Sequence, residues 1–202
     1  MNYLKLIKKT VTNLIESILV KIRYYDLDFS KNQVKSNSEH LQATIDWICL
    51  AQDKTECGGV SAYYNLTNSK WGTPYRETTG YIIETFINYF HITKNQKYLK
   101  RAIEMGEWEM EVQCEDGAFG ELKNDGSVGK KIFNTGQIII GLISLYKETR
   151  EEKYIDAAEK AGQWLMENQN KDGSWKNFTT QGQRTYHSRV AWPLLQIFEL
   201  TK

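Results

Sequence analysis

Three short polar stretches contain the residue types that acid–base chemistry uses. They are Arg76-Glu77-Thr78-Thr79, Phe133-Asn134-Thr135-Gly136-Gln137 and Tyr186-His187-Ser188-Arg189. Glu77 could act as a general base or acid, His187 could shuttle a proton near neutral pH, and Arg189 could hold a carboxylate through two hydrogen bonds. Each stretch stands at the start of an apolar, helix-like run, so the arrangement of those helices decides whether the three side chains meet.

The elements that would position these residues belong to a repeat. The segment "AGQWLMENQNKDGSW" (161–175) matches "MGEWEMEVQCEDGAF" (105–119) after a shift of 56 residues, and a looser copy, "DWICLAQDKTECGG" (46–59), lies a further 61 residues upstream. Every copy keeps a Trp five residues before a Gln and then closes on glycine. Three copies at a period of about 55 residues indicate a repeat architecture.

Each copy predicts two helices. The first helices, which carry the Trp-xxxx-Gln pattern, are expected at about 38–52, 95–113 and 151–169, and the apolar second helices at about 78–92, 134–148 and 186–200. Capping boxes are expected before the first helices, at Ser36-xx-Glu39, Thr93-xx-Gln96 and Thr149-xx-Glu152. Gly106 and Gly162 fall inside first helices, where close approach of a neighbouring helix would offset their low helix propensity.

The connections between these helices are unequal in length. Second helices lead to the next first helix in a few residues, whereas first helices lead to second helices through about 20, as in "CEDGAFGELKNDGSVGKKIF". All long loops therefore gather at one end of the helix stack, where a functional site is expected. Asp116 and Asp172 recur in every closely matched copy, and Asp-Gly is turn chemistry, so we interpret them as structural.

Composition and charge set limits on the function. The 202 residues include 26 basic and 25 acidic ones, so nothing indicates a nucleic-acid or anionic-membrane surface. The three cysteines, Cys49, Cys57 and Cys114, form no CxxC pair, and no metal or cofactor motif is present. Residues 1–30 are expected to contain an amphipathic helix rather than a signal peptide or membrane span, because polar residues interrupt each apolar run. A cytoplasmic protein is predicted, with a hairpin repeat domain over 31–202 (repeats 38–93, 94–149 and 150–202).

Paired helices closed by a Q-x-x-D-G-x-W-like turn resemble the α/α-toroid superfamily, which includes six-hairpin glycosidases, unsaturated glucuronyl hydrolases and terpene cyclases. More narrowly, "SAYYNL…WGTPYRETTGYIIETF", "FNTGQIIIGL" and "YHSRVAWPLLQ" resemble uncharacterised bacterial and archaeal toroid proteins associated with polysaccharide genes. The resemblance implies an all-α fold of three hairpins plus an N-terminal helix, which is half of an (α/α)6-type barrel. Because an uncapped repeat end leaves an apolar face bare, a homodimer that completes the ring is expected.

In six-hairpin enzymes the second helices point their N-termini at the substrate funnel, so the resemblance implies a site at the three polar stretches. Glu77 and His187 would be the catalytic residues, and Glu77 is expected to stay ionised beside helix N-termini and to serve as a base. The alternatives are a helix-start charge or an ion pair with Arg76 or Arg189 for Glu77, and a structural role for His187. Glu121 would be a second, solvated carboxylate. The expected substrate-binding residues are Tyr63, Tyr64, Trp71, Tyr75, Arg76, Asn134, Gln137, Trp175 and Arg189.

Three functions stay open at this point. The first is a carbohydrate-active protein that acts on an acidic glycan as a hydrolase, lyase or epimerase. The second is a non-catalytic module that binds a glycan or protein, or a remnant of a longer enzyme, because a catalytic funnel normally draws on the whole ring. The third is an isoprenoid-type enzyme, although the clustered aspartates of terpene cyclases are absent.

Overall fold

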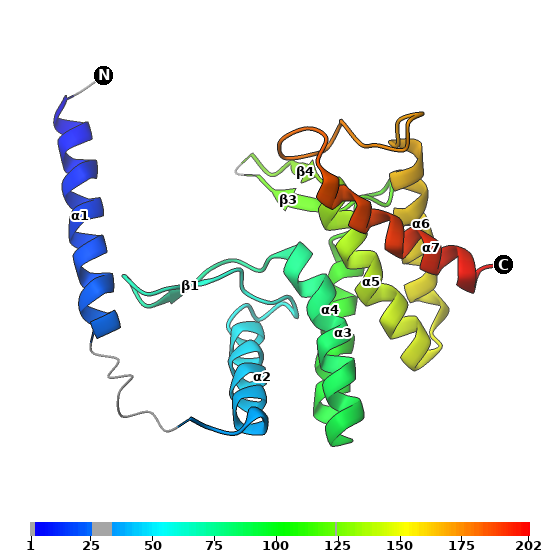
Figure 1. Ribbon diagram of the computed structural model, residues 1–202, viewed down its shortest axis with the longest axis horizontal. Coiled ribbons are helices and arrows are strands. Elements are labelled where there is room, and N and C mark those ends of the chain that lie inside the picture. Colours follow the sequence, from blue (N-terminus) through cyan, green and yellow to red (C-terminus); the bar gives the residue numbers. More distant parts are fainter. Residues whose placement is uncertain (1–2, 26–33, 124) are drawn as a thin grey trace.

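The structure, a computed structural model, describes residues 3–25, 34–123 and 125–202, and consists mainly of helices (Figure 1). The helices are α1 (Tyr3–Tyr25), α2 (Asn37–Asp53), α3 (Arg76–Thr93), α4 (Gln96–Glu111), α5 (Ile132–Thr149), α6 (Glu152–Glu167) and α7 (Ala191–Leu200), with a 3-10 helix η2 (Thr185–Val190). Two antiparallel strand pairs lie in the long loops: β1 (Tyr64–Asn65) with β2 (Lys70–Trp71), and β3 (Gly120–Leu122) with β4 (Val128–Lys130). The predicted all-α fold and its three hairpins are confirmed.

The helix starts agree with only one of the three predicted capping boxes. Ser36 caps α2 and exchanges hydrogen bonds with Glu39, as predicted. Thr93 and Thr149 are instead the last residues of α3 and α5, and each hydroxyl donates to a carbonyl four residues upstream. The prediction of these two capping boxes was wrong because the preceding helix continues through the threonine. The next residue, Lys94 or Arg150, then ends that helix in the left-handed conformation.

The helices form two layers. The second helices α3, α5 and α7 pack side by side, and the first helices α4 and α6 cover them from one side (Figure 1). Helix α5 lies at the centre, and most of its side chains are buried, including Ile138, Ile139 and Leu142. The middle hairpin is therefore covered by its two neighbours, whereas α2 and α7 stand at the edges.

A glutamine joins each hairpin to the next one. Gln52 donates from Nε2 to the carbonyl of Gly58 in its own loop (3.0 Å) and to that of Arg101 on α4 (3.2 Å). Gln113 repeats both bonds, to Gly117 (3.0 Å) and to Ala157 on α6 (2.9 Å). Because both carbonyls are backbone groups, this glutamine latch fixes loop and neighbouring helix in one register, which explains the recurring Gln in the sequence pattern.

Buried threonines hold the long loops onto the second helices. The Thr79 hydroxyl accepts a hydrogen bond from the Val60 amide, and Thr135 accepts one from the Phe119 amide. The corresponding position on α7 is Ala191, which has no hydroxyl. In that hairpin the second helix begins with the 3-10 turn η2 instead of a regular first turn. The loop ends of the first two hairpins are thus anchored alike, and the third differs.

Glycines allow helices to approach closely at Gly106 and Gly162, as expected, and also at a pair of second helices that the sequence did not single out. A Cβ built on Gly141 would lie 2.1 Å from the carbonyl oxygen of Gly80, so α3 and α5 cross backbone to backbone. A Cβ on Gly162 would instead meet Ile197 Cδ1 at 2.8 Å, which is the flexible end of a side chain. Gly106 likewise faces a methyl group of Leu145. The tightest helix crossing therefore lies in the second-helix layer.

We expect Gly141→Ala to destabilise the protein by about 1–3 kcal/mol, because the methyl group has no rotamer by which to avoid the Gly80 backbone. Gly162→Ala is the matched control, since the Ile197 side chain can move and Ala favours helix by about 1 kcal/mol. Urea unfolding followed by circular dichroism would measure both. Equal effects in the two variants would contradict the assigned crossing.

Apolar side chains are exposed at both edges of the hairpin stack and on the N-terminal helix. Trp47 on α2 and Trp192 and Phe198 on α7 are among them. Helix α1 lies to one side of the hairpins (Figure 1), and its described apolar residues Ile7 and Leu14 are exposed. Among the described residues, no helix combines the length and the hydropathy that a bilayer crossing requires.

Candidate functional site

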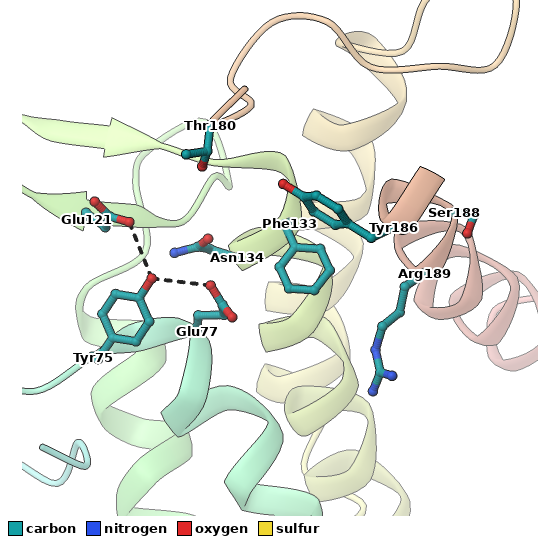
Figure 2. Close-up of a pocket in the computed structure, with 9 residues that line it drawn as sticks. All are labelled: Tyr75, Glu77, Glu121, Phe133, Asn134, Thr180, Tyr186, Ser188 and Arg189. Atoms are coloured by element: carbon teal, nitrogen blue, oxygen red, sulfur yellow. Dashed lines mark hydrogen bonds between the residues drawn. The ribbon is translucent and has the colours of Figure 1, made fainter. Parts of the chain in front are cut away.

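A cavity of about 480 Å³ opens at the loop end of the hairpins, where α3, α5 and η2 begin (Figure 2). This volume lies in the usual range for small-ligand sites. All three polar stretches of the sequence reach it, together with the β3–β4 hairpin. Its lining residues are Tyr75, Glu77, Glu121, Phe133, Asn134, Thr180, Tyr186, Ser188 and Arg189.

One wall of the cavity brings a phenol and two carboxylates together. The Tyr75 hydroxyl lies 3.3 Å from Oε2 of Glu77 and 3.3 Å from Oε1 of Glu121, and can donate to either (Figure 2). Tyr75 and Glu77 sit at the start of α3, whereas Glu121 belongs to β3 and is 44 residues further along the chain. The two carboxylates thus share one hydrogen-bond donor, and Glu121 is also exposed to solvent whereas Glu77 is partly buried.

The surroundings of this cluster shift the pKa values of Glu77 and Tyr75. Burial raises the pKa of Glu77, and the charge of Glu121 raises it further, while the Tyr75 hydrogen bond opposes the shift. This shift is opposite in direction to the one expected from the α3 N-terminus, which favours the ionised form, and the ionised state of Glu77 stays a prediction. Burial and the charges of Glu77 and Glu121 raise the pKa of Tyr75 to about 12. The phenol thus keeps its proton at neutral pH.

The arginines near the cavity have partners other than Glu77. Arg189 donates from Nε to Oε1 of Gln137 (2.9 Å), and Arg76 donates to the carbonyl of Gly120 (2.7 Å), which ties α3 to β3. In the described part of the chain, no ion pair between either arginine and Glu77 is found within 4 Å. The alternative that Glu77 serves only as a salt-bridge partner is therefore not supported by the geometry.

His187 lies apart from the cavity wall. Its side chain is 3% exposed, and neither ring nitrogen has a hydrogen-bond partner among the residues described. Burial lowers its pKa, and the nearby Arg184 lowers it further. The ring contacts that of Tyr186 at a centroid distance of 4.4 Å. The neighbouring residues Tyr186 and Ser188 line the cavity, whereas His187 does not.

Polar and aromatic groups complete the cavity. The side chain of Asn134 is buried. Its Nδ2 makes no hydrogen bond within 3.5 Å in the described ranges, but Asn134 is close enough to the Tyr75 hydroxyl to lower the pKa of that phenol. Phe133 and Tyr186 form an edge-to-face pair at 5.0 Å on the side opposite Glu121 (Figure 2). Thr180, in the last long loop, was not predicted, because no motif surrounds it and the loop reaches the site only through the fold.

Four of the expected rim aromatics lie outside this cavity. Tyr64 and Trp71 pack with Trp47 as a cluster beside α2, with ring centroids 4.8–5.8 Å apart, and Tyr63 is exposed next to them. Trp175 is 3% exposed and donates from its indole nitrogen to the carbonyl of Leu165. Tyr75 is the aromatic of the predicted set that lines the cavity.

Comparisons with known proteins give the fold and one partial family match. The model of the ulvan lyase N-terminal domain matches residues 130–186, which include Phe133, Asn134, Thr180 and Tyr186 of the cavity. No curated protein matches the sequence at a significant level.

Solved structures resemble most of this chain. A possible GH105 family member from Salmonella enterica superposes with a TM-score of 0.59 at 13% identity, over 80% of this chain and 49% of that one. The Lin0763 protein from Listeria innocua superposes with a TM-score of 0.60 at 22% identity, over 82% of this chain and 51% of that one. A third structure is the unsaturated glucuronyl hydrolase from Bacillus sp. GL1, which is described as responsible for glycosaminoglycan degradation. It superposes with a TM-score of 0.58 at 14% identity, over 82% of this chain and 53% of that one. The chain therefore has the α/α-toroid fold and spans about half the length of the solved structures it resembles.

Proposed function

We propose that the chain acts on an acidic glycan and cleaves it by β-elimination in the cavity at the start of α3 and α5. The observation that carries the proposal is the contact of one phenol, Tyr75, with two carboxylates, Glu77 and Glu121, on the wall of that cavity. Elimination needs a base and an acid side by side, because one removes a proton while the other protonates a nearby leaving oxygen. The partial match to an ulvan lyase domain supports the same reaction.

In this proposal Glu77 is the base and Tyr75 the acid. Glu77 takes the proton from C5 of a uronate, the C5–H electrons form the C4=C5 double bond, and the C4–O bond breaks. The departing oxygen takes the Tyr75 proton, and the tyrosinate then regains one from Glu77 across their 3.3 Å contact, which restores both groups. A raised pKa makes Glu77 a stronger base than an ordinary carboxylate, and Tyr75 holds its proton until the leaving oxygen forms.

The substrate would be held by groups that have unused hydrogen-bonding capacity. Asn134 would donate from Nδ2 to the uronate carboxylate, whose negative charge increases when C5 loses its proton. The terminal amino groups of Arg189 would bind the same carboxylate, while its Nε stays on Gln137. Phe133 and Tyr186 would contact the sugar ring. An anionic substrate also suits a cavity onto which the N-termini of two long helices open.

The proposal includes the setting of the protein. We place it in the cytoplasm, with no nucleic-acid partner, and with a hairpin domain over 31–202 that follows an N-terminal helix. A homodimer that completes the ring is also part of it, because apolar side chains such as Trp47, Trp192 and Phe198 are exposed at both edges of the hairpin stack.

Short-wavelength ultraviolet absorbance tests the reaction, since a new C4=C5 double bond conjugated with the carboxylate absorbs there. The chain would be mixed with ulvan and with other uronate-rich polysaccharides, and with short oligosaccharides that already carry the double bond. We expect absorbance to rise with at least one polysaccharide. A fall with the unsaturated oligosaccharides would replace elimination by hydrolysis of the unsaturated sugar. Binding seen by calorimetry without any absorbance change would instead support the non-catalytic module.

A further inference from the structure

The two edges of the hairpin stack carry complementary halves of the contact that joins consecutive hairpins. The glutamine latch occurs complete between the first and second hairpins and between the second and third. In the third hairpin, Gln169 donates from Nε2 to Gly173 in its own loop (2.9 Å), as the earlier glutamines do. Its second acceptor, a carbonyl on a following first helix, is missing from the described residues, and Gln169 is exposed there.

The loop glycines show the same incomplete contact. Gly58 and Gly117 have positive φ, and a Cβ on them would lie 2.6 Å from the Glu104 carbonyl oxygen and 2.3 Å from that of Lys160, on the next first helix. Gly173 has the same backbone conformation, with φ at +81°, but no atom lies within 4 Å of its Cβ position in the described structure. The third loop thus has the shape that receives a first helix, and that place is open.

The opposite edge shows a first helix that no preceding loop covers. Trp108 and Trp164 are 7% and 4% exposed, and Gly59 of the preceding loop lies directly on the Trp108 ring. Trp47, at the same repeat position on α2, is 51% exposed. On α4, the Arg101 carbonyl accepts the hydrogen bond from Gln52, and the Glu104 carbonyl lies against Gly58. The 61-residue shift of the repeat places His40 and Ala43 at the corresponding positions of α2. Both residues are exposed on the Trp47 face of α2.

We propose that this edge of α2 binds the open third loop of a second copy of the chain. Gln169 of one copy would donate to the His40 carbonyl of the other in place of the Thr44 hydroxyl, which donates to that carbonyl at 2.9 Å in the single chain. Gly173 would lie against the backbone at Ala43, and the loop would cover Trp47. The contact continues an interface that the chain already makes twice within itself. In the second-helix layer, the exposed face of α7, with Trp192, Leu195 and Phe198, would be covered by α3 of the other copy.

Two such contacts close a ring. Three hairpins from each copy give six, and a two-fold axis relates the two identical edge-to-edge contacts, so no edge is left to add further copies. The inference rests on the homodimer that the proposed function includes and specifies its contacts. It does not depend on the elimination chemistry, because the mass of the assembly and the turnover of glycan are separate measurements.

Light scattering after size-exclusion chromatography of the full chain would give the mass of the assembly. We expect about twice the chain mass of 23.5 kDa. Gly173→Ala should raise the dimer Kd at least tenfold, since its methyl group would meet the α2 backbone. Gly126→Ala is the matched control: it lies in another Asp-Gly-Ser turn, with φ at +82°, open space around it and the same 2.6 Å Ser-to-Asp hydrogen bond. Its Kd should change less than twofold.

A second variant does not disturb a turn. Ala43→Arg places a long charged side chain on an exposed helix position, so the monomer should fold normally by circular dichroism while the dimer Kd rises at least tenfold. A monomeric wild-type chain would overturn the inference. So would a dimer that Gly173→Ala and Ala43→Arg leave intact, or one that Gly126→Ala weakens as much as Gly173→Ala.

Discussion

Glu77→Gln is expected to lower glycan turnover by about 100-fold to 10,000-fold, the range that a positioned acid or base contributes. The amide keeps the size of the side chain and can still accept a hydrogen bond from Tyr75, but it cannot take a proton. Because burial and Glu121 raise the Glu77 pKa, the wild-type rate should fall with decreasing pH at a midpoint above 4.5, the ordinary value for a glutamate. Initial rates measured across pH would show both effects.

The control for Glu77 is a carboxylate outside the cavity. Glu111 is exposed at the end of α4, and Glu111→Gln should leave the rate and its pH midpoint unchanged. Glu121→Gln offers a further check, because removing its charge takes away one cause of the raised Glu77 pKa and should move the acidic midpoint to lower pH. If Glu77→Gln retains the wild-type rate, Glu77 is not the base.

Replacement of Glu109 by Leu should stabilise the protein by about 1–3 kcal/mol at neutral pH, because a buried polar group without a hydrogen-bond partner costs about that much. Glu109 is 0% exposed, and neither carboxylate oxygen has a hydrogen-bond partner in the described structure. A carboxylate is unusual at this position of the repeat, because the corresponding residues in the other two hairpins are Ile48 and Leu165. The change to Leu therefore restores the residue type that the other two hairpins use.

The effect of Glu109 depends on pH with a definite sign. Burial holds its pKa well above 4.5, and the charge of Arg76 only partly opposes the shift. The folded chain therefore keeps a proton that the unfolded chain releases above pH 4.5. The stability that this group contributes is fully present below pH 4.5 and is lost as pH rises toward the folded-state pKa, at about 1.4 kcal/mol per pH unit.

Urea unfolding from pH 4 to pH 8 would measure this dependence. The stability gained by Glu109→Leu should be small at pH 4 and should grow with pH, whereas Glu111→Leu, at an exposed position of the same helix, should change stability by less than about 0.5 kcal/mol. Glu109→Gln removes the charge but keeps a polar group, so the stability that it gains should lie between the changes caused by Glu109→Leu and by Glu111→Leu. A gain from Glu109→Leu that does not vary with pH would contradict a protonated buried carboxyl.

The hairpin architecture could be predicted from the sequence because it depends on local signals. The 3.6-residue spacing of apolar side chains, the Trp-xxxx-Gln pattern and the Asp-Gly turns recur in each copy and act over a few neighbouring residues. The unequal loop lengths also pointed to the loop end of the stack, and a cavity lined by Glu77, Asn134 and Arg189 lies there.

The details of the site were decided by contacts between segments far apart in the chain. The raised pKa of Glu77 depends on burial and on Glu121, which approaches only because the β3–β4 hairpin folds back over α3. Trp175 looks like a loop aromatic, but its indole reaches the Leu165 carbonyl and the core. The sequence by itself determined the repeated helix pairs and the end where they form a site, since these follow from short-range spacing. Only the tertiary structure determined which side chains face the cavity and in which direction their pKa values shift, because burial and charge proximity are properties of the packed chain.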